Sequence, residues 1–282
     1  MGKYTGILII SDVDGTFFSK LSRPAFDKNA ATVWKFKAQG GLFTFATGRD
    51  FPALLEVIPD AGEIANAPII VCNGAQIYDA MGDKFIYDCP VSNKKLLREI
   101  IVRICEKYPE IGVRFSCEHN MIVPELNEML RRDLHGYSLE KLRLTEKPLD
   151  ELINSDIKIY KCVIADSDMP ENLESVREIL ADADKNNEFY FAKSYLSGIE
   201  IVDRDGSKGQ AALQLKKYTG ARVLYAIGDY ENDIEMLNAA DFGAAPQSAL
   251  EQVKCAAKII TVGCDDGAVA DLIDIIGREI TP

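Results

Sequence analysis

The sequence predicts an α/β protein whose parallel-sheet core carries an inserted, smaller α+β domain. Near both ends of the chain, short apolar segments ending in polar or acidic residues alternate with helical segments, as in a parallel sheet. Between them, from about residue 84 to residue 195, helices and short strands follow without another acid-tipped strand. We therefore expect a core domain of residues 1–83 and 196–282 and an inserted domain of residues 84–195.

Composition restricts the class of protein. The 282 residues, 47% hydrophobic and 27% charged, suit a folded globular chain with a sizeable core. The net charge of −12 argues against a sequence-independent nucleic-acid binder, which needs cations to neutralise phosphates. Seven cysteines without a Cys-x-x-Cys pair indicate a reducing compartment. Because the chain shows neither a membrane span nor a signal-peptide core, we expect a cytoplasmic protein with no membrane partner; its oligomeric state is unknown.

The first predicted strand is an apolar run, residues 7–10, that leads into Ser11-Asp12-Val13-Asp14-Gly15-Thr16. Two carboxylates this close repel each other unless a cation or a proton lies between them, which favours a hard ion such as Mg²⁺. An EF-hand calcium loop does not fit the spacing of Gly15. A metal motif of the kind found in glycosyltransferases, or an ordinary exposed turn, remains an alternative for these residues.

The next elements continue the βα rhythm. A helix is expected over residues 27–39, followed by a strand over 42–46 that ends in Thr47-Gly48-Arg49. Ligands of parallel sheets bind at the carboxyl ends of strands, so this loop lies where a phosphate can be held. The alternative is a turn that starts the next helix and carries a surface arginine. A third strand over 68–71 precedes Asn73-Gly74, which has the composition of a tight turn.

The inserted region and the last third differ in their polar residues. Both histidines of the chain, His119 and His135, fall in the inserted region, so the sequence gives little support for a histidine-based zinc site or a Ser-His-Asp triad. In the last third, Ser207-Lys208-Gly209 precedes a helix. An apolar strand over 222–227 then runs into residues 228–233, which contain a second carboxylate cluster, Asp229 and Asp233.

Taken together, these four motifs resemble those of the haloacid dehalogenase superfamily, and most of all the Cof-type phosphatases with a large α/β cap (subclass IIB). The resemblance covers residues 6–80 and 195–275 and rests on Asp-x-Asp-Gly-Thr, the Thr-Gly pair, Ser-Lys-Gly and Gly-Asp-x-x-Asn-Asp. It implies a Rossmann-like core with an inserted cap. It also implies an Mg²⁺-dependent phosphomonoester hydrolase acting on a small phosphorylated metabolite, such as a sugar phosphate.

The resemblance assigns a role to each motif residue. Asp12 would be the nucleophile that forms an aspartyl-phosphate, and Asp14 would be the general acid and base. The other implied roles are phosphate binding by Thr47, Gly48, Lys208 and Asn232, Mg²⁺ binding by Asp12, the backbone carbonyl of Asp14 and Asp229, and support of the metal ligands by Asp233.

Asp14 separates this chain from some relatives but not from others. Dehalogenases of the superfamily lack an acid two residues after the nucleophile, and the ion-pumping ATPases carry Thr there and have membrane spans. Phosphomannomutases share the Asp-x-Asp-Gly-Thr start and a related cap, so a sugar phosphomutase is one alternative. A non-catalytic protein that binds a phosphometabolite is another, although a pure binder has no need of Asp14.

Overall fold

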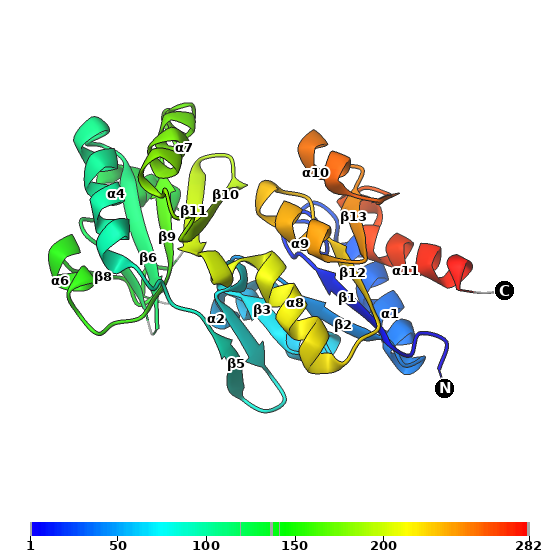
Figure 1. The fold of residues 1–282 in the computed structure, drawn as a ribbon. Coiled ribbons are helices and arrows are strands. Elements are labelled where there is room, and N and C mark those ends of the chain that lie inside the picture. The colour runs from blue at the N-terminus through cyan, green and yellow to red at the C-terminus, as the bar shows by residue number, and fades with distance from the viewer. Residues whose placement is uncertain (1, 119, 136–137, 141, 281–282) are drawn as a thin grey trace. The chain divides into compact units, whose positions relative to one another are not determined.

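A computed structural model describes residues 2–118, 120–135, 138–140 and 142–280. The chain divides into two compact units, one formed by Met1–Asp88 with Ser207–Pro282 and the other by Cys89–Gly206 (Figure 1). We call them the core unit and the inserted unit. None of the helices among the described residues combines the length and the apolar character needed to cross a membrane.

The core unit is built on a parallel sheet of five strands in the order β14-β13-β12-β1-β2. Its strands are β1 (Ile7–Ser11), β2 (Leu42–Phe45), β12 (Val223–Ile227), β13 (Phe242–Pro246) and β14 (Ile259–Thr261). A second, antiparallel sheet consists of β3 (Ile69–Val71), β4 (Gln76–Asp79) and β5 (Lys84–Asp88). The predicted fold class, a parallel α/β core with an inserted domain, is confirmed.

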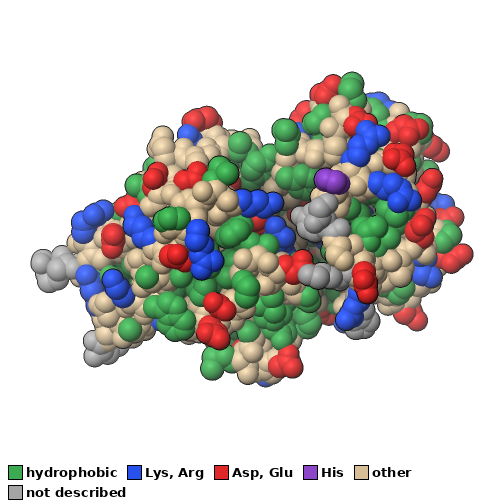
Figure 2. Space-filling view, turned by 180° about the vertical axis from the view of Figure 1, so that it is seen from behind, with side chains coloured by type: hydrophobic (Ala, Val, Ile, Leu, Met, Phe, Trp, Pro, Cys, Tyr) green, Lys and Arg blue, Asp and Glu red, His purple; other side chains and the backbone are tan. Residues whose placement is uncertain are grey.

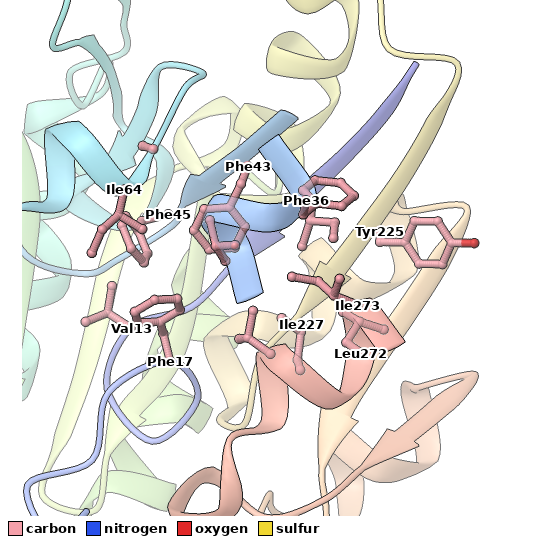
Figure 3. Packing of buried hydrophobic residues seen from close by; sticks show 14 of the residues in the cluster. Val13, Phe17, Phe36, Phe43, Phe45, Ile64, Tyr225, Ile227, Leu272 and Ile273 are labelled. Atoms are coloured by element: carbon pink, nitrogen blue, oxygen red, sulfur yellow. The ribbon is translucent and has the colours of Figure 1, made fainter. Parts of the chain in front are cut away.

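Helices cover both faces of the five-stranded sheet, because successive residues of a strand point to opposite faces. In β1, Ile7 and Ile9 pack in one apolar cluster, whereas Leu8 and Ile10 pack in another. The first cluster lies against α1 (Arg23–Ala38) and α11 (Ala268–Glu279), and the second lies against α8 (Lys208–Thr219), α9 (Ile234–Ala239) and α10 (Glu251–Ala256). Figure 3 shows the first cluster, in which rings and aliphatic side chains from strands and helices interdigitate. The short helices α2 (Phe51–Val57) and α3 (Ala61–Ile64) complete the core unit.

The inserted unit contains a six-stranded sheet in the order β10-β11-β9-β6-β7-β8, in which all neighbours are antiparallel except β7 and β8. Its strands are β6 (Gly112–Cys117), β7 (Met121–Val123), β8 (Thr145–Glu146), β9 (Ile159–Ala165), β10 (Phe189–Tyr195) and β11 (Gly198–Asp203). Its helices are α4 (Lys94–Lys107), α5 (Glu128–Asp133), α6 (Leu149–Ile153) and α7 (Asn172–Ala183). Apolar side chains of α4 and α7 pack on one face of this sheet. Lys161 and Glu200 lie outside that apolar cluster and form a buried ion pair of 2.7 Å.

The borders of the two units differ from the expected borders at residues 83/84 and 195/196. β5 belongs to the core unit because it pairs with β4, and β11 belongs to the inserted unit because it pairs with β9 and β10. Such pairing depends on which strands meet in space, which the local sequence pattern does not report. Of the two histidines of the chain, His119 lies outside the described residues.

The surface carries charges of both signs. On the face drawn in Figure 2, Asp and Glu side chains are interspersed with Lys and Arg side chains, and apolar side chains reach the surface between them. Apolar atoms normally supply a large part of a protein surface, so this mixture needs no special explanation.

Candidate active site

The predicted site residues of the core unit come together at one edge of the parallel sheet. Asp12 directly follows β1, Thr47 lies two residues beyond β2, and Asp229 lies two residues beyond β12. These three strands are parallel neighbours with β1 in the middle, so their carboxyl ends lie side by side. The backbone N–H of Asp12 donates to the carbonyl oxygen of Ile227, at 2.9 Å, which fixes the start of the first loop against β12.

Lys208 links the two acidic motifs. It is the first residue of α8, whose N-terminus is capped by the Ser207 hydroxyl, and its side chain is almost completely buried. The Lys208 Nζ donates to Asp12 Oδ1 at 2.6 Å and to Asp233 Oδ1 at 2.7 Å. Burial by itself lowers the pKa of Lys208, but the two carboxylates outweigh burial and raise it, so the ammonium keeps its charge.

Two further contacts hold Asp229 in place. The Thr16 hydroxyl donates to Asp229 Oδ1 at 2.7 Å, and the backbone N–H of Asp229 donates to Asp233 Oδ2 at 3.0 Å. Gly15 has φ +84°, and a Cβ placed on it would lie 2.4 Å from Asp229 Oδ2. The Asp14–Gly15 turn therefore needs glycine both for its left-handed backbone and for its close approach to the Asp229 carboxylate.

The charges of the cluster call for a cation. Carboxylate oxygens of Asp12, Asp229 and Asp233 lie within 4.8 Å of one another, and Lys208 offsets only part of their charge. Burial, followed by the nearby carboxylates, raises the pKa of Asp12 well above its usual range despite the opposing Lys208. Burial and Asp233 likewise raise the pKa of Asp229 to about 7. A buried set of oxygen donors with excess negative charge suits a hard divalent ion such as Mg²⁺, so these residues fit the metal that the motifs imply.

Asp14 and Arg49 form an ion pair that the sequence motifs do not predict. Arg49 Nε donates to Asp14 Oδ2 at 2.8 Å, and Arg49 Nη2 donates to Asp14 Oδ1 at 3.0 Å. This two-point contact fixes the orientation of the carboxylate while leaving its side chain 46% exposed. Arg49 is therefore not simply a surface arginine. Its position next to Thr47-Gly48 was the available signal, but its partner lies 35 residues away in the sequence.

The remaining predicted phosphate ligands are also held in place by local contacts. The N–H of Thr47 donates to the carbonyl oxygen of Ile70 at 3.0 Å, and the Thr47 hydroxyl accepts from the N–H of Arg49 at 3.1 Å. Gly48 lies between them in the same loop. The buried Asn232 donates to the side chain of Asn73, at 3.0 Å, a residue whose sequence context indicates only a turn.

The parallel sheet, the inserted unit and the acidic cluster at the strand ends agree with a match to a family of hydrolases. A sequence model described as haloacid dehalogenase-like hydrolase matches residues 9–273, almost the whole chain. The chain belongs to the haloacid dehalogenase-like hydrolase family.

Relatives match this chain over most of its length. The chain is 26% identical over 292 residues to the 5-amino-6-(5-phospho-D-ribitylamino)uracil phosphatase YwtE of Bacillus subtilis, covering 94% of this chain and 96% of that protein. It is also 26% identical over 274 residues to the chloroplastic endoribonuclease YBEY of Arabidopsis thaliana. That match covers 94% of this chain but only 45% of the plant protein, so the chain spans less than half of that relative.

Solved structures agree on the fold. A structure described as a HAD subclass IIB sugar phosphatase superimposes with a TM-score of 0.78 at 22% identity, covering 96% of this chain and 98% of that one. A Streptococcus mutans protein superimposes with a TM-score of 0.79 at 24% identity, covering 95% and 98%. The Cof-type, subclass IIB resemblance drawn from the motifs is confirmed at the level of family and fold, and so is the enzyme class, a phosphatase of this superfamily.

Proposed function

We propose that the protein is an Mg²⁺-dependent phosphomonoester hydrolase that acts on a small phosphorylated metabolite, such as a sugar phosphate, through an aspartyl-phosphate on Asp12. One observation carries the proposal. The Asp12 carboxylate is held by Lys208 at 2.6 Å, beside the Asp229 carboxylate, at the end of the central strand β1. A nucleophilic carboxylate beside a fixed cation is what covalent phosphoryl transfer requires.

The reaction has two steps in this proposal. In the first, an Asp12 oxygen forms a bond to phosphorus, the bond from phosphorus to the alcohol oxygen breaks, and Asp14 gives its proton to that oxygen. In the second, Asp14 takes a proton from a water molecule, which attacks phosphorus and breaks the bond to Asp12. The exposed Asp14 can exchange protons with solvent, and Arg49 holds its carboxylate in one orientation between turnovers.

The other motif residues would bind the phosphoryl group and the metal. Thr47, Gly48, Lys208 and Asn232 would donate hydrogen bonds to phosphoryl oxygens, which spread their charge in the transition state. Asp12, Asp229 and the backbone carbonyl of Asp14 would hold Mg²⁺, with Asp233 supporting them through its contacts with Lys208 and the Asp229 backbone. The bound ion would supply further neutralisation of phosphoryl charge.

The inserted unit would select the substrate, as a cap domain. A sugar phosphate or a related polyol phosphate agrees with the names of relatives, which include a sugar phosphatase and a phosphoribitylaminouracil phosphatase. A cytoplasmic location is part of the proposal, supported by the seven cysteines, all of which are free thiols.

The decisive experiment compares Asp12→Asn with wild type in the hydrolysis of p-nitrophenyl phosphate, with Mg²⁺ and with EDTA. Asp12→Asn should abolish turnover while the protein stays folded by circular dichroism. Asp27→Asn makes the same chemical change at an exposed position of α1 in the same unit and should keep full activity.

Three results would contradict parts of the proposal. Mg²⁺-dependent turnover by Asp12→Asn would remove Asp12 as the nucleophile. Isomerisation of a sugar 1-phosphate with little phosphate release would favour the mutase. Tight binding of phosphate esters without hydrolysis across a broad panel would favour a non-catalytic binding protein.

A further inference from the structure

The segment Cys72-Asn73-Gly74, which directly follows β3, has an unusual backbone. Its three residues have φ values of +51°, +60° and +108°, and all three are buried. The other non-glycine residues with positive φ among the described residues, Asp83, Arg143 and Asn187, are exposed. Left-handed backbone costs energy for residues with a side chain and persists only where the surroundings enforce it. Contacts with the surrounding elements therefore hold this segment in its conformation.

Its backbone is tied to the loop that carries the predicted phosphate ligands after β2. The N–H of Cys72 donates to the carbonyl oxygen of Arg49 at 2.8 Å, and the N–H of Asn73 donates to the carbonyl oxygen of Thr47 at 2.9 Å. Two hydrogen bonds from adjacent residues of the segment therefore connect it to the loop after β2. The Thr47 backbone is therefore held at both of its polar groups: its carbonyl oxygen accepts from Asn73, and its N–H donates to Ile70 of β3.

The same segment packs against the start of α8. A Cβ placed on Gly74 would lie 2.2 Å from the carbonyl carbon and oxygen of Ser207 and 2.6 Å from the backbone nitrogen of Lys208. Only a glycine allows the two backbones to approach this closely. The position of the segment and the position of the Lys208 backbone are therefore coupled.

The third connection is made by a side chain. The Asn232 Nδ2 donates to Asn73 Oδ1 at 3.0 Å, and the two residues are only 5% and 3% exposed. An amide side chain has a broad, roughly two-fold preference about its last torsion, so a buried asparagine needs a partner to select one orientation. Asn73 supplies an acceptor that only one orientation of the Asn232 amide can use.

We propose that Asn73 is a positioning residue for phosphoryl binding. It fixes the positions of the Asn232 amide and the Thr47 loop relative to Lys208. This inference rests on the proposed function, because Asn232 and Thr47 matter only if a phosphoryl group binds there. With one N–H of Asn232 occupied by Asn73, its other N–H has a fixed direction in which to meet a phosphoryl oxygen. Asn73 itself does not touch the substrate in this proposal.

The test removes the Asn73 amide without disturbing the backbone. Glycine adopts the left-handed conformation freely, so Asn73→Gly deletes the acceptor while the segment keeps its shape. Asn187→Gly is the matched control, since it makes the same change at an exposed, left-handed asparagine (φ +56°) of the inserted unit. The measured quantities are the inhibition constant of inorganic phosphate against p-nitrophenyl phosphate, its affinity by calorimetry with Mg²⁺, and the melting temperature.

We expect Asn73→Gly to weaken phosphate binding and inhibition about tenfold, the usual order for losing a residue that orients a ligand group. Asn187→Gly should match wild type. Because Asn73 acts through Asn232, the change Asn232→Ala should add little in the Asn73→Gly background, although it weakens phosphate binding in wild type. A purely structural role would lower the melting temperature but leave phosphate affinity of the folded protein unchanged.

Asn73→Asp provides a second comparison, and it decides the question if Asn73→Gly does not fold. The carboxylate keeps an acceptor for Asn232, so Asn232→Ala should weaken phosphate binding by the same factor in the Asn73→Asp background as in wild type. A clearly smaller loss of phosphate affinity would overturn the proposal. An unchanged phosphate affinity in Asn73→Gly, or a full Asn232→Ala effect in that background, would overturn it as well. Absence of turnover in both wild type and Asn187→Gly would instead refute the proposed function.

Discussion

Replacement of Lys208 by Met tests the electrostatic centre of the site. Met has a similar length but no charge, so Lys208→Met deletes two buried charge-assisted hydrogen bonds, of 2.6 Å to Asp12 and 2.7 Å to Asp233. Each such bond contributes about 1.5–3 kcal/mol, and breaking a buried pair by removal of one partner typically costs about 3–5 kcal/mol. We expect the free energy of unfolding of the core unit to fall by about 4 kcal/mol, a large part of the roughly 5–15 kcal/mol of an ordinary domain.

The chain has a convenient probe for this measurement. Trp34 is the only tryptophan, and it lies in α1 of the core unit with the Lys37 ammonium 3.8 Å from its ring centroid. Its fluorescence during urea unfolding therefore reports on the core unit, even if the inserted unit unfolds separately. EDTA in the buffer prevents bound metal from offsetting the loss.

Lys216→Met is the matched control on the same helix. Lys216 forms an ion pair with Asp241 at 2.7 Å but is partly exposed. The substitution should therefore lower the free energy of unfolding by no more than about 1 kcal/mol. A loss below about 1 kcal/mol for Lys208→Met would refute the buried-pair argument. So would a double variant Asp12→Asn/Lys208→Met whose destabilisation equals the sum of the single changes, because partners of one ion pair must show coupling.

Three other changes follow from named contacts. Arg49→Leu should lower kcat about tenfold by freeing the Asp14 carboxylate, with less than about 1 kcal/mol lost in urea unfolding because this pair is partly exposed. Gly15→Ala should lower the free energy of unfolding by about 1–2 kcal/mol, because the backbone at this position is left-handed. It should also weaken Mg²⁺ binding in calorimetry, because the new Cβ displaces Asp229. Lys161→Met should destabilise the inserted unit by about 3 kcal/mol in thermal melts followed by circular dichroism, since it removes the lysine partner of the buried Glu200 carboxylate.

Each of these three predictions has a contrary outcome. Unchanged kcat in Arg49→Leu would show that proton transfer by Asp14 does not depend on the orientation that Arg49 gives its carboxylate. Wild-type Mg²⁺ affinity in Gly15→Ala would separate Asp229 from the metal. For Lys161→Met, adding Glu200→Gln should recover most of the lost stability, because it removes the buried charge that Lys161 neutralises in wild type. Failure to recover stability would mean that packing and not charge explains the loss.

Local patterns in the sequence were sufficient for the elements around the site. Apolar runs that stop at Asp12, at Thr47 and at Asp229 predicted three strand ends, and all three follow strands of one parallel sheet. The reason is that a buried parallel strand needs a continuous apolar run and that polar residues follow where it emerges at the sheet edge. The interruption of this rhythm indicates the inserted α+β unit.

Other features depend on pairs of residues that are distant in sequence. β5 and β11 lie in different units from those expected because their partners, β4 for one and β9 and β10 for the other, decide their membership. Asn73 had only the composition of a turn. Its left-handed backbone and its contact with Asn232, 159 residues away, became visible only in the folded chain.

The sequence by itself determined which chemical groups this protein has at its strand ends and helix starts: two acids separated by one residue, a lysine at a helix start and a second acidic cluster. Tertiary structure alone decided how these groups are paired. Lys208 lies 196 residues from Asp12, yet it contacts Asp12 and Asp233 at once, while Asp14 is held by Arg49. The physical reason is that electrostatic interactions depend on distance and burial in space, and the sequence specifies neither directly.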